Sequence, residues 1–223
     1  MTALVYRGPA SVPGCPEAVA ALLAEPRWGL DVRYVGPRED LALTDRVLAN
    51  ATLYAQPGGG TLRQGWRRMR RHRRALRRFV ADGGRYVGFC LGAYLAGATP
   101  GFALLPGDTD QYVGSEGALL DTEDDTVVEV DWGGRRRTVF AQDPTTFVLE
   151  GAGTGAEVIA RYPDGPPAAL VAPYGDGRVG VVGPHPEATV DWFLDAGLPV
   201  PAEGGDDLAR DLARDLVDRT LEH

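Results

Sequence analysis

The sequence predicts an α/β fold with a mostly parallel central sheet, helices on both faces and extra antiparallel strands in the second half. Through the first 98 residues, short apolar strand patterns alternate with helical patterns, as in βαβ units. In the second half, strand patterns follow one another and are separated by Gly, Pro and Asp turns. The 223 residues suffice for one well-buried domain of the larger kind.

The first half contains four predicted strands and three predicted helices. Pro16 fits the start of the first helix, because a backbone N–H group is not needed there. Residues 30–35 alternate and are β-branched, which predicts a strand. In order, the predicted elements are a strand at 3–6, a helix at 16–25, strands at 30–35 and 51–56, a helix at 63–80, a strand at 85–89 and a helix at 91–98.

The second half contains six predicted strands, at 126–132, 135–142, 146–151, 156–162, 168–174 and 177–183. The last two form a hairpin with a tight turn at Asp176–Gly177. Helices return at 188–195 and 206–219. We expect a single domain over residues 1–198, a linker and a charged helix over 199–220, and the remnant of an expression tag at 221–223.

The composition is that of a globular protein. Apolar residues make up 44% of the chain and charged residues 24%. No run approaches about 18 apolar residues, so no transmembrane helix and no membrane association are expected. The first residues suggest a strand rather than a signal peptide, and Cys15 and Cys90 do not suggest a disulfide framework. We therefore expect the reducing environment of the cytoplasm.

A strongly basic segment lies within this acidic chain. The net charge is −8 and lysine is absent, yet nine of the 23 arginines fall within residues 63–78, with no acid among them. Apolar residues recur at helical spacing at Trp66, Met69, Leu76, Phe79 and Val80. The plain interpretation is an amphipathic helix with a solvated arginine face. Contacts with acidic residues elsewhere in the chain could absorb much of its charge. An anionic partner or substrate is an alternative, and nucleic-acid binding is a weaker one that we do not expect.

Cys90 stands between two glycines where a strand meets a helix. A sharp strand-to-helix turn strains the corner residue and requires small neighbours two positions away, which Gly88 and Gly92 provide. The corner lifts the side chain above the C-terminal edge of the sheet, where a helix N-terminus favours negative charge on the sulfur. The pattern predicts a nucleophilic cysteine, with a small residue packed at an ordinary turn as the alternative.

His185 is the best candidate for the base that a nucleophilic thiol requires. It follows the predicted strand 177–183, so it would lie at the same sheet edge as Cys90 if the two strands are parallel. Glu187, two residues later, can reach the imidazole and hold its tautomer. His72 lies in the arginine-rich segment, where it is expected to face solvent.

A glycine-rich loop, Gln-Pro-Gly-Gly-Gly, follows the predicted strand 51–56. It lacks the spacing and the Lys-Ser/Thr pair of a P-loop. Its glycines allow a backbone N–H group to approach a reacting carbonyl closely. Gly59 and Gly60, together with the N–H group of Leu91, could therefore form an oxyanion hole. A plain helix-entry turn is the alternative.

Cys15 lies in the predicted loop after the first strand and could approach the same sheet edge. A second active-site thiol is one interpretation, and an ordinary loop cysteine is the simpler one. No sequence feature predicts a bound cofactor or a metal ion.

These motifs, in this order, resemble the class I glutamine amidotransferase-like superfamily. The closer resemblance is to the amidotransferase-like domain at the N-terminus of biotin–protein ligases and to its stand-alone relatives. It is carried by LVYRGPAS, QPGGG, FVADGGRYVGFCLGAYLAG and VVGPHPE. The resemblance implies a flavodoxin-like three-layer α/β/α sandwich. It also implies Cys90 as nucleophile, His185 as base and Glu187 as orienting carboxylate.

We expect a cysteine-dependent enzyme that cleaves an amide or a related acyl bond of a small molecule. Water would resolve the acyl-enzyme, or a partner protein would accept the released ammonia. The alternative is a non-catalytic domain on the same scaffold that binds a ligand or a regulatory partner. The sequence leaves the substrate and the oligomeric state open.

Overall fold

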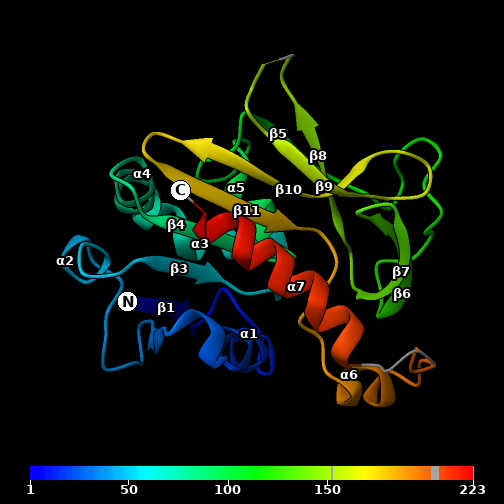
Figure 1. Cartoon of the computed structure of the whole chain (residues 1–223), viewed down its shortest axis with the longest axis horizontal. Coiled ribbons are helices and arrows are strands. Elements are labelled where there is room, and N and C mark those ends of the chain that lie inside the picture. Colours follow the sequence, from blue (N-terminus) through cyan, green and yellow to red (C-terminus); the bar gives the residue numbers. More distant parts are fainter. Residues whose placement is uncertain (152, 202–205, 223) are drawn as a thin grey trace.

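The core of the structure is a set of five parallel strands (Figure 1). The computed structural model describes residues 1–151, 153–201 and 206–222. Within these ranges the strands lie in the order β2 (Asp31–Val35), β1 (Thr2–Tyr6), β3 (Leu53–Gln56), β4 (Arg85–Phe89) and β11 (Gly177–Val182). Each pairs in parallel with its neighbour. The predicted parallel core is confirmed, and the C-terminal ends of all five strands meet at one sheet edge.

Antiparallel strands continue the same sheet beyond β11. They follow in the order β10 (Pro167–Tyr174), β9 (Glu157–Arg161), β6 (Thr126–Trp132) and β7 (Arg135–Ala141). The predicted antiparallel addition is therefore confirmed. A separate pair is formed by β5 (Gly107–Gln111) and β8 (Thr145–Leu149). The sequence does not predict β5, because Gly-Asp-Thr-Asp-Gln has no apolar alternation.

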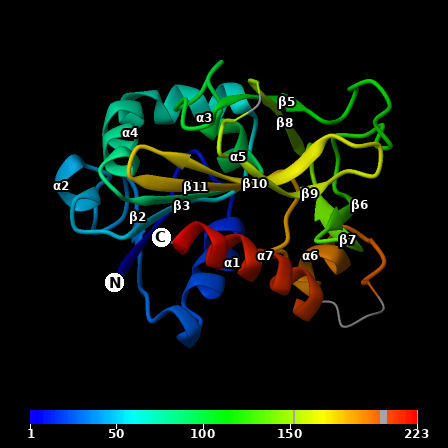
Figure 2. The ribbon, with the colours of Figure 1, turned by 45° about the horizontal axis from the view of Figure 1, so that its top comes forward.

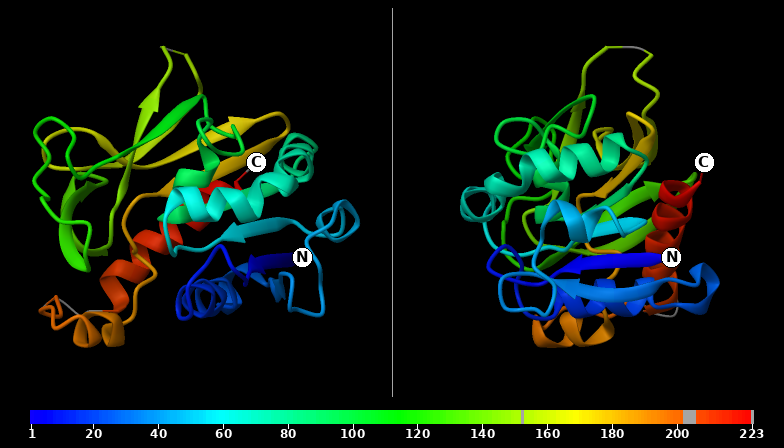
Figure 3. Two further views of the ribbon diagram at one scale, coloured as in Figure 1. Left: turned by 180° about the vertical axis from the view of Figure 1, so that it is seen from behind. Right: turned by 90° about the vertical axis from the view of Figure 1, so that its left-hand side faces the viewer.

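Helices cover both faces of the sheet, which gives the three layers seen in Figure 2 and Figure 3. One face carries α1 (Cys15–Leu23), the short 3₁₀ turn η1 (Pro26–Trp28) and α7 (Asp206–Leu221). The other carries α2 (Asp45–Leu48), α3 (Leu62–Met69), α4 (Arg73–Ala81) and α5 (Leu91–Ala96). The short α6 (Val190–Asp195) lies beside one end of α7 (Figure 1). No helix in the described ranges combines the length and apolarity needed to cross a lipid bilayer.

The first helix shows how the sequence pattern positions an element. In α1, Val19, Leu22 and Leu23 are spaced three and four residues apart and are completely buried against the sheet. Pro16 lies in its first turn, as predicted. The helix begins one residue earlier than predicted, so Cys15 is its first residue rather than part of the preceding loop.

The arginine-rich segment is interrupted rather than continuous. The predicted helix 63–80 is split into α3 and α4 by a 3₁₀ turn, η2 (Arg70–His72). Its apolar face is confirmed, because Met69, Leu76 and Val80 are completely buried. His72 is half-buried in the turn, where burial and the neighbouring Arg71 lower its pKa.

The charge of this segment is not balanced by acidic residues elsewhere. Among the nine arginines of residues 63–78, Arg78 alone forms an ion pair within the described ranges, with Asp45 at 3.5 Å. The expectation that contacts inside the chain absorb much of the charge is therefore wrong. The apolar residues face the sheet, and the exposed guanidinium groups of α3 and α4 lie on the outer side of that layer.

Two further boundaries differ from the prediction. The turn of the β10–β11 hairpin is Gly175–Asp176, one residue earlier than predicted, because Tyr174 pairs with Gly177 and Gly175 adopts a φ of 60°. The predicted linker and tag lie partly outside the described residues, at 202–205 and 223. Leu221 is the last residue of α7 and packs against the core.

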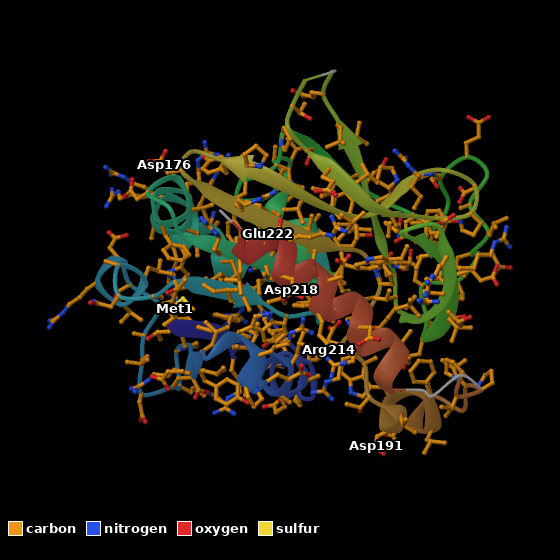
Figure 4. The ribbon with its side chains drawn as sticks, viewed as in Figure 1. Met1, Asp176, Asp191, Arg214, Asp218 and Glu222 are labelled. Carbon is orange, nitrogen blue, oxygen red and sulfur yellow. The ribbon has the colours of Figure 1, made fainter. Side chains whose placement is uncertain are left out.

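A cluster of partly buried ion pairs joins α7 to the segment after α1. Glu25 accepts hydrogen bonds from Arg214 at 2.8 and 3.1 Å and from Arg210 at 3.1 Å. Further along α7, Asp218 accepts a hydrogen bond of 2.6 Å from the indole N–H of Trp28. Figure 4 labels Arg214 and Asp218 on this helix. The hydrogen bonds from Arg214 lower the pKa of Glu25 by more than its burial raises it.

We expect Glu25→Gln to destabilise the protein by about 1 kcal/mol at pH 7. Because the pKa of Glu25 is lowered on folding, its contribution is present above the unfolded value and is lost as the pH falls through the folded value. Urea unfolding at pH 7 and pH 3 would test this, since the difference from the unmodified protein should shrink at pH 3. Asp31→Asn is the matched control, because its partner Arg33 is solvent-exposed. Equal effects of the two substitutions would contradict the expectation.

Candidate functional site

The fold brings Cys90 and His185 to the same sheet edge. Cys90 directly follows β4, and His185 lies three residues after the end of β11. These strands are parallel neighbours, with Val182 opposite Phe89. The backbone N–H group of Cys90 donates to the carbonyl of Val182 at 3.0 Å. The parallel pairing on which the sequence argument depended is therefore present.

Cys90 occupies a strained corner between β4 and α5. Its φ of 48° lies in the left-handed region, which is unusual for a residue with a side chain. A Cβ atom on Gly88 would lie 2.5 Å from the carbonyl oxygen of Gly92, and one on Gly92 would lie 2.0 Å from that of Gln56. Both positions thus exclude a side chain. The strained corner and the need for two flanking glycines are confirmed.

His185 and Glu187 form a buried pair. The Nδ1 atom of the imidazole and the Oε1 atom of the carboxylate are 2.8 Å apart, and the side chains are only 3% and 0% exposed. Burial by itself lowers the pKa of His185. The negative charges of Cys90 and Glu187, and their hydrogen bonds to the ring, outweigh it and raise that pKa well above its usual range. The surroundings of the ring therefore favour the protonated form of the imidazole.

Gly58 lies between the thiol and the imidazole. A Cβ atom at Gly58 would be 3.3 Å from the Cβ of Cys90, 2.5 Å from Cε1 of His185 and 3.4 Å from its Nε2. The Nε2 side of the ring thus faces the loop and Cys90, while Nδ1 faces Glu187. Gly58 belongs to the same Gln-Pro-Gly-Gly-Gly motif as Gly59 and Gly60 but was not among the predicted site residues.

The residues predicted to form the oxyanion hole, Gly59, Gly60 and Leu91, differ in their surroundings. Gly59, with a φ of 126°, packs against the backbone of Val12, where a Cβ atom would be 2.3 Å from the nitrogen. Gly60 has a φ of 71° and is exposed. Leu91 is the first residue of α5, so its N–H group directly follows Cys90. Among the three loop glycines, Gly58 is the one whose added Cβ atom would have Cys90 and His185 as its nearest neighbours.

A backbone carbonyl covers the thiol. The Sγ atom of Cys90 donates to the carbonyl oxygen of Gln142 at 3.6 Å, and Cys90 is only 6% exposed. Gln142 directly follows β7, which reaches the site through an antiparallel bridge between Phe140 and His185. In this bridge the N–H group of His185 donates to Phe140 at 2.8 Å. Gln142 was not among the predicted site residues, because a contact between residues as far apart in the sequence as Cys90 and Gln142 leaves no local pattern.

A cavity of about 330 Å³ opens beside these residues. His185, Gly59 and Gln142 line it, together with the aromatic rings of Phe140 and Trp192. Cys15 also lines it and is 5% exposed, whereas Cys90 is not a lining residue and adjoins the cavity through its contact with Gln142. Within the described ranges, no group of three or more His, Cys, Asp or Glu side chains is placed to hold a metal ion. The arrangement is suited to chemistry at sulfur.

Solved structures share this fold. A glutamine amidotransferase from Methylobacillus flagellatus matches with a TM-score of 0.63 and 16% identity, covering 99% of this chain and 93% of its own. PurLQS from Thermotoga maritima matches with a TM-score of 0.62 and 17% identity over 98% of both chains. Another glutamine amidotransferase gives 0.60 and 17%, covering 88% of this chain and 99% of its own. The chain thus shares its fold with proteins described as glutamine amidotransferases.

Residues 1–119, more than half of the chain, match the model of the family described as the N-terminal region of biotin–protein ligase. The chain belongs to this family. No curated protein matches it at the sequence level. The family that the motifs suggested is therefore confirmed, and the fold matches that of glutamine amidotransferases.

Proposed function

We propose that the protein is a cysteine-dependent hydrolase acting on an amide or a related acyl bond. Cys90 is the nucleophile, His185 the base and Glu187 the carboxylate that orients the imidazole. The observation that carries this proposal is the strained corner at Cys90, next to a buried His185–Glu187 pair at the same sheet edge. A thiol packed there for structural reasons alone would not require an ion pair beside it.

The reaction begins with attack of the Cys90 sulfur on the substrate carbonyl. His185 receives the thiol proton and then donates it to the leaving nitrogen, so the C–N bond breaks and a thioester remains. His185 next takes a proton from water, which attacks the thioester. The acid product leaves, and the thiol recovers its proton. Glu187 stabilises the imidazolium formed in each half of the cycle.

Backbone N–H groups would stabilise the oxyanion of each tetrahedral intermediate. We assign this role to Leu91 and to the loop that includes Gly59 and Gly60. The neighbouring Gly58 supports the assignment, because it gives the loop close access to both Cys90 and His185. The Gln142 carbonyl occupies space against the sulfur, so a substrate must displace it.

A partner protein is part of the proposal if the substrate is a primary amide such as glutamine. The structures that share the fold include proteins described as glutamine amidotransferases. With a primary amide as substrate, the leaving group is ammonia, which a partner protein would consume. With water as the only acceptor, the protein would act alone as an amidase.

A non-catalytic binding domain is the second candidate function. The observation that favours it is the cover over Cys90, whose sulfur faces a carbonyl and is almost inaccessible. On this interpretation the cavity holds a ligand or a partner segment, and the strained corner shapes its wall without reacting.

The test combines turnover with thiol reactivity. We expect the native protein to hydrolyse members of a panel of small amides and p-nitrophenyl esters, and both Cys90→Ser and His185→Ala to lower kcat/KM by at least about 100-fold. At pH 7, His185→Ala should also slow iodoacetamide alkylation of Cys90, measured by peptide mass spectrometry, by roughly tenfold or more. His72→Ala, outside the site, is the matched control. Unchanged alkylation in His185→Ala, with no turnover in any protein, would favour the binding domain.

A further inference from the structure

The cavity beside Cys90 has an acidic wall. Asp125 and Asp195 line it, and apart from His185 they are the only charged side chains among its described lining residues. Asp125 is held in place, since its Oδ1 atom accepts a 2.8 Å hydrogen bond from the side-chain amide of Gln142. The main-chain carbonyl of Gln142 faces the Cys90 sulfur. The wall therefore offers acceptors and negative charge to a bound molecule.

The negative field extends to the second thiol. Burial raises the pKa of Cys15, and the negative charges of Glu187 and Cys90 raise it further. Asp125 and Glu17 act in the same direction, and Glu17 forms an ion pair with Arg7 at 3.4 Å. The carboxylates of Asp125 and Asp195 would attract a cation that enters this cavity and repel an anion, whereas the imidazole of His185, which also lines it, is paired with Glu187.

No arginine is among the described residues that line this cavity. Nine arginines lie in residues 63–78, in the layer of α3 and α4 on the opposite face of the sheet from α1. The rest of the chain carries 14 arginines against 31 acidic residues. Outside residues 63–78, acidic residues therefore outnumber arginines by 17.

Aromatic rings complete the cavity wall. Phe140 and Trp192 pack edge to face, with centroids 5.5 Å apart, and Trp192 packs in the same way on His185 at 5.3 Å. Trp192 is only partly buried, so part of its indole is free for a ligand. A cation beside such a ring gains both a cation–π contact and apolar burial of its carbon chain.

We propose that the substrate of this site is cationic: an amide or ester whose acyl or leaving group carries an ammonium group on a hydrocarbon stem. The ammonium group lies between Asp125 and Asp195, the stem lies against Phe140 and Trp192, and the scissile carbonyl faces Cys90. This inference rests on the proposed function for the reaction itself. The charge preference is a property of the cavity and can be measured without turnover.

The test is calorimetric binding of two probes of similar size, 2-phenylethylammonium and 3-phenylpropionate, to the full-length Cys90→Ser protein. We expect the cation to bind and the anion not to bind. Asp125→Asn and Asp195→Asn should each weaken cation binding by roughly threefold or more. Asp176→Asn is the matched control. Figure 4 labels this residue at the turn between β10 and β11, at the other end of the molecule from α6 and Asp191.

A second readout uses reagents that form a mixed disulfide with a thiol and release methanesulfinate. The rate ratio of aminoethyl to sulfonatoethyl methanethiosulfonate at Cys90 should exceed one and should fall in the two cavity variants but not in Asp176→Asn. Equal or better binding of the anion, binding of neither probe, or equal effects of all three variants would overturn the proposal. Absence of turnover with every amide would reject the proposed hydrolase but leave these ratios unchanged.

Discussion

Gly92→Ala should destabilise the protein by about 3 kcal/mol or more, through a backbone clash that cannot relax. The added Cβ would lie 2.0 Å from the carbonyl oxygen of Gln56, at the end of β3. Gln56 is completely buried and tied on both sides, since its Oε1 accepts from Tyr54 at 2.7 Å and its Nε2 donates to Ala10 at 2.9 Å. Urea unfolding followed by tryptophan fluorescence would measure the loss.

Gly65→Ala is the matched control, because Gly65 is also a helical glycine close to a neighbour. Its added Cβ would meet the side-chain tip of Leu91 at 2.9 Å, and such a tip can shift. The gain in helix propensity of about 1 kcal/mol should offset much of that contact. If the two substitutions had equal effects, the tight packing inferred at the corner of Cys90 would be wrong.

Glu187→Gln should remove both stability and thiol reactivity, because it takes the carboxylate away from a buried imidazolium. We expect a loss of about 3 kcal/mol at pH 6. Since the pKa of His185 is raised on folding, the stabilisation is complete below its unfolded value of about 6.5 and is lost as the pH rises through the folded value. The difference in free energy of unfolding between the unmodified protein and Glu187→Gln should therefore become smaller at alkaline pH. Urea unfolding between pH 5.5 and 9.5 would measure it.

The control for Glu187→Gln is Glu129→Gln, which breaks the exposed contact between Glu129 and Arg136. It should change stability little at any pH. If the loss in free energy of unfolding caused by Glu187→Gln stays constant or grows as the pH rises, the imidazole of His185 is neutral in the folded protein. In the same samples, iodoacetamide alkylation of Cys90 at pH 7 should slow.

The parts of the site that the sequence predicts are those with local causes. Gly88 and Gly92 flank Cys90 because a sharp strand-to-helix turn leaves no room there for Cβ atoms, and this demand is visible within five residues. His185 could be placed beside Cys90 because the strand before each is apolar and the parallel arrangement brings their ends together. The order of strands is not needed for that inference, only their common direction.

The parts that the sequence does not predict depend on distant contacts. Gln142 covers the sulfur only because Phe140 bridges to His185, which fixes the register of β7 at the site. Trp192 joins the cavity through its packing on the same two rings. The break in the arginine-rich helix at residues 70–72 contains neither Gly nor Pro, so no local signal marks it.

The bridge between Phe140 and His185 has a consequence for engineering this fold. The groups proposed to react are carried by strands β4 and β11, whereas Asp125, Phe140 and Gln142 come from the β6–β7 hairpin and its flanks. Part of the proposed ligand preference is thus encoded in a stretch of chain that does not carry the reacting groups. Exchanging the hairpin at residues 125–142 while keeping the His185 bridge would offer a way to redirect ligand preference and leave the parallel core untouched.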